Sequence, residues 1–166
     1  MKTHHSLLFV LLMFFAGNSV ADEQPVTINI SRMSLDTALT AAQASIAACR
    51  KKGAQITVTI VDRGGHPQVV LRDVLSMDVS IRISRDKAYT AMSFNSSTSS
   101  LLGRFKGAYG VPKTKGLMIA RGGLPIVAAG TIFGGIGVSG SSEEIDEQCA
   151  QAGLDAILDD LEMSTE

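Results

Sequence analysis

Tryptophan is absent from this sequence, and aromatic and charged residues are scarce. Aromatic residues make up 5% and charged residues 19% of the 166 positions, whereas hydrophobic residues make up 45%. This composition excludes a disordered or fibrous chain, because low charge and a large apolar fraction favour a buried core. The length is that of one domain, so we expect a single compact globular unit.

The longest apolar run, residues 7–16, is too short to span a bilayer. It follows the basic Lys2 and precedes the small residues Ser19 and Ala21, which is typical of a secretory signal peptide. We therefore expect a signal peptide over residues 1–21 and a periplasmic or secreted domain over residues 22–166, without stable membrane insertion. The alternative is an uncleaved anchor.

Histidine and basic charge are in short supply in the expected mature chain. Cleavage would remove one of the 15 basic residues and none of the 16 acidic ones, so the net charge would be −2. No basic patch would remain, and we do not expect nucleic acid as a partner. His66 would be the only histidine, which excludes a zinc site built on several histidines.

The chain has only two cysteines, Cys49 and Cys149. Each falls on the apolar face of a segment with helical periodicity, so both thiols are expected to face the interior. Export to an oxidising compartment would favour a disulfide between them. Such a bridge would add about 4–5 kcal/mol in the chain-entropy model. The alternative is two buried thiols that do not meet.

Alternating hydrophobicity, caps and turn residues divide the first half of the domain into predicted elements. Residues 26–30 are expected to form a short strand, and residues 35–52 a helix. Residues 55–73 predict a hairpin with a double-glycine turn, because β-branched runs flank the two glycines. Residues 80–94 predict a second helix with a stripe of small residues.

The second half continues with a loop, three strands and a helix. Residues 95–115 are rich in turn-forming residues and are expected to form a loop with one helical turn, a length that is often functional. Strands are expected over residues 117–120 and twice within residues 126–140. Ser141 and Glu144 form a capping box that begins the final helix.

The segment TIFGGIGVSGSSEEIDEQCAQAGL contains G-x-G-x-x-G at Gly135, Gly137 and Gly140, the pattern of a dinucleotide-binding fingerprint. A true fingerprint opens a βαβ unit. Here no strand is predicted after the helix, and the helix start is acidic where a pyrophosphate needs positive potential. We reject nucleotide binding and expect the glycines to let a helix, a neighbouring subunit or a flat ligand approach a central strand.

Carboxylates crowd the start of the predicted final helix. They are a candidate for a surface iron site; the alternative is that the helix dipole alone accounts for acidic residues in a first helical turn. The residues are Glu143, Glu144, Asp146 and Glu147.

Four segments, VTIVDRGGHPQVVLRD, SRDKAYTA, GGLPIVAAGTIFGGIGVSG and DEQCAQAGL, resemble in order and spacing the GlcG/HbpS-like haem-degrading family, which includes the C-terminal domain of PduO-type proteins. The resemblance implies a single profilin-like α+β domain with a five-stranded (or six-stranded) antiparallel sheet flanked by helices. It places the two cysteine-bearing helices side by side. It further implies homo-oligomers, from dimers to octamers, and haem or corrinoid binding in some members. The chain departs from the family at DVLSMDVS, near the expected ligand cleft.

The resemblance and the small side chains favour a cleft for haem or a related flat tetrapyrrole. Its expected walls are the hairpin tip at residues 64–67, the helix segment at residues 87–90, and Gly122 and Gly123. His66 is the candidate axial ligand of the iron, because imidazole is a common haem ligand. The alternative is a solvated histidine at a loop tip.

Five further side chains are candidates for contacts with that ligand. Cations would neutralise propionates, and hydroxyl groups would offer an oxygen to iron. The cations are Arg72, Arg82 and Lys87, and the oxygen donors are Tyr89 and Thr90. For Arg72 the favoured interpretation is a cross-strand pair with Asp62.

The sequence contains no evident catalytic constellation. One histidine at a loop tip, without a nucleophile partner, does not make a triad, and paired cysteines would not serve as nucleophiles. We therefore expect a binding protein rather than an enzyme: an exported carrier or sensor component for haem. Two alternatives remain, an enzyme that acts on haem or a small organic acid, and a structural module that forms oligomers.

Overall fold

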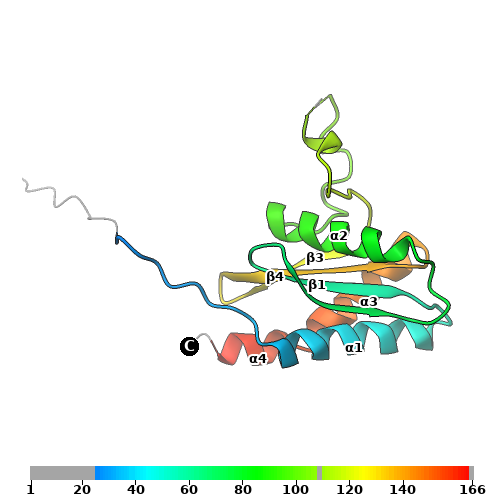
Figure 1. Cartoon of the computed structure of the whole chain (residues 1–166), viewed down its shortest axis with the longest axis horizontal. Helices are drawn as coiled ribbons and strands as arrows, with labels where there is room; N and C mark the ends of the chain where they lie inside the picture. The colour runs from blue at the N-terminus through cyan, green and yellow to red at the C-terminus, as the bar shows by residue number, and fades with distance from the viewer. Residues whose placement is uncertain (1–24, 108–109, 165–166) are drawn as a thin grey trace, which may run out of the picture.

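A computed structural model describes residues 25–107 and 110–164 (Figure 1). The expected signal peptide lies outside the described residues. The helices and strands follow in chain order: α1 Leu35–Lys51, β1 Thr57–Asp62, β2 Pro67–Arg72, α2 Ser80–Phe94, the 3-10 helix η1 Val111–Lys113, β3 Gly123–Ala128, β4 Thr131–Ser139, α3 Glu143–Asp155 and α4 Leu158–Met163.

The described strands form one antiparallel sheet in the order β2-β1-β4-β3. Helix α2 covers one face, and α1, α3 and α4 cover the other (Figure 1). The main core lies between the sheet and α1 and α3, where Ile60, Ile136 and Val138 are fully buried. An antiparallel sheet with helices packed on both faces confirms the expected α+β class.

The predicted strand count is wrong, because the described residues contain four strands and neither five nor six. Residues 26–30 run alongside no sheet edge and extend away from the body (Figure 1). Residues 117–120 also form no strand, since the backbone N–H of Met118 donates to Thr90 Oγ1 on α2 (2.8 Å). A strand forms only where a neighbouring strand supplies hydrogen-bond partners, and neither segment pairs with the sheet.

The glycines of β4 let α2 approach the sheet closely, which confirms one of their predicted roles. A Cβ added at Gly137 would lie 2.0 Å from the carbonyl oxygen of Ser84, and one at Gly135 would lie 2.4 Å from that of Ala88. Hydrogen bonds between hydroxyl groups also join α2 to the sheet, and Thr57 Oγ1 on β1 lies 2.6 Å from Ser80 Oγ on α2. The glycine pattern therefore serves helix packing.

Gly137→Ala should destabilise the protein by about 2–3 kcal/mol, because the new methyl group meets the backbone of α2 and forces the helix away from the sheet. Urea unfolding measures the change. Gly110→Ala is the matched control, since no atom of the described residues other than its chain neighbours lies within 4 Å of its Cβ position, and its φ is negative. Equal stability of the two variants would contradict the close packing.

Helices α1 and α3 pack side by side and carry the disulfide Cys49–Cys149, with Cα atoms 5.6 Å apart. Gly153 allows this contact, since a Cβ there would lie 2.6 Å from the carbonyl oxygen of Ala41. The final helix differs from its prediction in two ways. Its cap is Ser142 rather than Ser141, and it ends at Asp155 before the separate α4.

Among the residues that the structure describes, no helix is both long and apolar enough to cross a membrane.

Candidate ligand-binding groove

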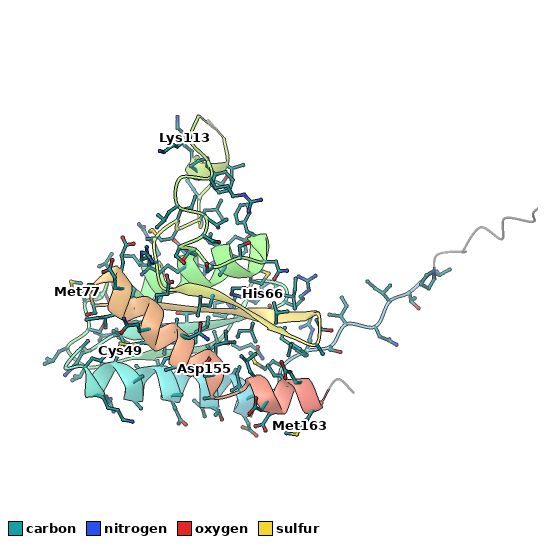
Figure 2. The ribbon with its side chains drawn as sticks, turned by 180° about the vertical axis from the view of Figure 1, so that it is seen from behind. Cys49, His66, Met77, Lys113, Asp155 and Met163 are labelled. Carbon is teal, nitrogen blue, oxygen red and sulfur yellow. A yellow bond between two sulfur atoms is a disulfide. The ribbon has the colours of Figure 1, made fainter. Side chains whose placement is uncertain are left out.

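A loop projects from the α2 face of the domain (Figure 1). A groove is lined by residues of α2 and of this loop. It consists of two adjoining hollows of about 320 and 630 Å³. Both are lined by Arg85, Asp86, Lys115 and Gly116. The groove joins the hairpin tip to the base of the projecting loop, which carries Lys113 at its outer end (Figure 2).

The first hollow is completed by the hairpin tip and by Tyr89. Gly65 makes room for the tyrosine ring, because a Cβ at Gly65 would lie 2.6 Å from Tyr89 Cδ2, and its φ of +81° suits glycine. The second hollow is completed by the residues Arg82, Thr114, Leu117 and Met118. The groove therefore combines a cationic lining with an aromatic and an aliphatic wall.

Asp62 shapes the hairpin tip that carries His66. Its Oδ1 accepts hydrogen bonds from the backbone N–H of Gly64 (2.8 Å) and of His66 (2.9 Å), and it lies 3.4 Å from His66 Nδ1. Burial raises the pKa of Asp62, but these amides and the nearby cations outweigh it and lower the pKa overall. The imidazole itself is 82% exposed, at one end of the groove.

Thr90 joins the projecting loop to α2 through hydrogen bonds of its hydroxyl group. Its hydroxyl donates to the backbone carbonyl of Asp86 (2.6 Å) and accepts from the backbone N–H of Met118 (2.8 Å). The side chain is fully buried. In this arrangement Thr90 positions the groove wall and does not offer its oxygen to a ligand.

Lys87 does not line the groove, although the sequence predicted it there. Its Nζ is buried and donates to Asp146 Oδ2 (3.0 Å) and to the backbone carbonyl of Val138 (2.9 Å). Gly122 and Gly123 lie against the same lysine, since their Cβ positions fall 3.1 Å from Lys87 Nζ and 2.5 Å from its carbonyl oxygen. The two glycines make space for Lys87 and leave no open wall for a ligand.

Asp146 is likewise buried rather than part of a surface site. Its Oδ1 accepts from the backbone N–H of Ser141 (3.0 Å), and burial raises its pKa while Lys87 opposes that rise. Glu143 accepts from the backbone N–H of Arg121, and Glu147 accepts from Ser99. Among the described residues, no group of three or more histidine, cysteine or acidic side chains is gathered as metal ligands would be.

The predicted pair between Asp62 and Arg72 is wrong, because the two residues lie at opposite ends of the hairpin. Arg72 is opposite Thr57 at the far end, and its Nη1 donates to the backbone carbonyl of Ser76 (2.6 Å). Asp62 is bonded instead to Arg32 (3.5 Å) and to the hairpin tip. Arg72 is therefore also distant from the groove.

Of the predicted site residues, His66, Arg82 and Tyr89 line the groove together. Sequence reasoning missed Arg85 and Lys115. Arg85 lies three residues after Arg82 and four before Tyr89, and this helical spacing is a signal that would have found it. No local pattern identifies Lys115, because the fold of the loop brings it to α2.

Comparisons with known proteins agree on one family. The family model for haem-degrading HbpS-like proteins matches residues 33–155. An uncharacterized 15.0 kDa protein from the dhaT-dhaS intergenic region of Citrobacter freundii is 32% identical over 133 residues, 77% of this chain and 94% of that protein.

Two solved structures extend the comparison. A double mutant of Streptomyces reticuli HbpS is 34% identical with a TM-score of 0.76, and the match covers 86% of this chain and 98% of that one. PduOC in a haem complex is 27% identical with a TM-score of 0.72, and the match covers 76% and 96%. The fold is thus that of HbpS and of the C-terminal domain of PduO. The chain belongs to the HbpS-like family, as the four sequence segments predicted.

Proposed function

We propose that this protein binds haem, or a related tetrapyrrole with acidic side chains, in the groove between α2 and the projecting loop. One observation carries the proposal: two adjoining hollows share Arg85 and Lys115, with His66 at one end and Met118 at the other. Membership of the HbpS-like family and the haem complex of PduOC support the choice of ligand.

The residues of the groove suit the chemistry of haem. Arg82, Arg85 and Lys115 provide three positive charges against one carboxylate, Asp86, and so favour a ligand with propionate groups. The Tyr89 ring and the aliphatic end of the groove provide contacts for a flat apolar ring. Pockets of a few hundred Å³ with a few charged groups are typical of cofactor sites.

His66 is the proposed iron ligand. A ligating histidine commonly has its other ring nitrogen beside a carboxylate, which fixes the ring and raises its basicity. Asp62 lies beside Nδ1 of His66 (3.4 Å), so Nε2 would be the ring nitrogen that binds the iron. When bound, haem would supply an iron centre able to take small axial ligands.

We expect haem titration of the purified protein to give a saturable change in the Soret band. Arg85→Ala combined with Lys115→Ala should weaken binding about tenfold or more, because charge-assisted contacts to propionates are lost. Arg104→Ala is the control, an exposed arginine outside the groove lining. A doubly substituted protein that binds as tightly as the Arg104 variant would contradict the site.

His66→Ala should shift the Soret maximum and weaken binding. An unchanged spectrum would assign the iron to another ligand, and the candidates within the groove lining are then Tyr89 and Met118. Loss of the band on addition of a reductant would indicate haem turnover and favour the enzyme alternative over a carrier or sensor.

Export and self-association complete the proposal. Cleavage after Ala21 would place the protein in a periplasm or outside the cell, where the disulfide of α1 and α3 is stable. Intact mass of the exported protein tests this, since a mass that includes residues 1–21 would contradict cleavage. We also propose a homo-oligomer, with a carrier or sensor role for the bound haem.

A further inference from the structure

The segment before α1 has the residue pattern of a strand but pairs with no other strand among the described residues. Its apolar side chains alternate with polar ones, and Val26, Ile28 and Ile30 are 101%, 73% and 57% exposed. The described segment extends away from the body (Figure 1). An alternating β-branched segment in this state lacks both a sheet edge and an apolar surface to cover it.

The sheet has an open edge that offers both. Among the described residues, no backbone hydrogen bond joins another segment to the outer edge of β2. The opposite edge strand, β3, is less suited to pairing, because Pro125 has no N–H and Thr98 already bonds both backbone groups of Gly123. An open edge with free donors and acceptors is a template for another strand.

A groove of about 310 Å³ runs beside this edge, between α1 and β2. Its apolar lining comes from Ile46 and Leu71, and polar side chains surround it. A strand added to β2 would direct alternate side chains to the α1 side of the sheet, into this groove. The apolar stripe of residues 26–30 fits that requirement.

We propose that residues 26–30 of one copy add as a fifth strand to the β2 edge of a second copy, with isoleucine side chains in the α1–β2 groove. Two contacts hold the chain after this segment against its own β1–β2 hairpin: Arg32 bonds to Asp62, and Gln68 Nε2 donates to the carbonyl of Met33 (3.1 Å). Residues 26–30 lie before these contacts and extend away from the domain, so we assign the β2 edge of a second copy as their partner. Added strands of this kind gain affinity from main-chain hydrogen bonds and specificity from side-chain pockets.

The test compares two charge-matched double variants of the full chain. Ile28→Asp with Ile30→Asp places carboxylates in the groove, whereas Thr27→Asp with Asn29→Asp places them on the outward face. Sedimentation velocity should show that the isoleucine variant raises the dissociation constant of the assembly about 100-fold or more. The control variant should stay assembled like the unaltered protein.

Amide hydrogen exchange of β2 provides a local measurement. Outward amides of β2 should be protected in the assembly and exposed in the isoleucine variant, and their protection should fall on dilution as the assembly dissociates. An assembled isoleucine variant, equal dissociation of both variants, or a monomeric unaltered protein would overturn the proposal. So would β2 protection that persists in the diluted monomer, because the strand would then come from the same chain.

Discussion

Lys87→Met should lower the free energy of unfolding by about 3–5 kcal/mol at neutral pH, because it leaves the buried carboxylate of Asp146 without its cation. The side chains of both residues are at most 3% exposed. Methionine preserves much of the volume of lysine, so the loss arises from charge rather than from a cavity. Denaturant unfolding measures the change.

The double variant Lys87→Met with Asp146→Asn is the matched control. Asparagine keeps an oxygen that accepts from the backbone N–H of Ser141, but it carries no charge. We expect the double variant to recover at least half of the stability that Lys87→Met loses. A double variant less stable than Lys87→Met alone would show that the carboxylate is tolerated without its partner.

The pH dependence of Lys87→Met follows from the raised pKa of Asp146. Without Lys87 the carboxyl of Asp146 binds its proton more tightly in the folded state than in the unfolded state. Its contribution to stability is therefore fully present below the unfolded pKa and is lost as the pH rises through the folded pKa. We therefore expect the penalty of Lys87→Met to be smaller near pH 4.5 than near pH 7. A penalty that grows on acidification would contradict this assignment.

Reduction of the disulfide should lower the free energy of unfolding by about 4–5 kcal/mol, since Cys49 and Cys149 close a loop of 100 residues. The corresponding loss in Tm is roughly 10–20 °C for a domain of this size. Calorimetry of oxidised and reduced protein measures both. The bridge joins the first and third helices, so its loss frees α3 from α1.

Cys49→Ala combined with Cys149→Ala separates the bridge from reagent effects. This variant should match the reduced protein with or without reductant. Reactive thiols in the unreduced, denatured protein, or a stability unchanged by reduction, would contradict a role for the bridge in stability.

The sequence predicted those elements whose signals are local. Helical periodicity predicted α1 and α2, and the double glycine predicted the β1–β2 hairpin. Residues 26–30 and 117–120 have similar β-branched or apolar character, but pairing depends on distant chain segments. The first segment lies beside no edge of its own sheet, and the second is bonded to α2 through Met118.

The site shows the same division between local and distant information. Helical periodicity predicted Lys87 outside the small-residue stripe of α2, whereas the structure buries it on the same helix as Ser84 and Ala91. Its partner Asp146 lies 59 positions further along the chain, and only the fold reveals it. His66 and Tyr89 were predicted because their types suit haem, whereas Lys115 reaches the groove through loop geometry that no local pattern encodes.

Amide NMR spectra recorded with ferric haem test the proposed groove most directly, since paramagnetic iron broadens resonances close to it. Haem in the groove predicts selective broadening at residues 64–66, 85–89 and 114–118, saturating with haem and absent when Arg85 and Lys115 are alanine. Broadening centred instead on the α1–β2 groove near Leu71, or no saturable effect at any residue, would contradict the account.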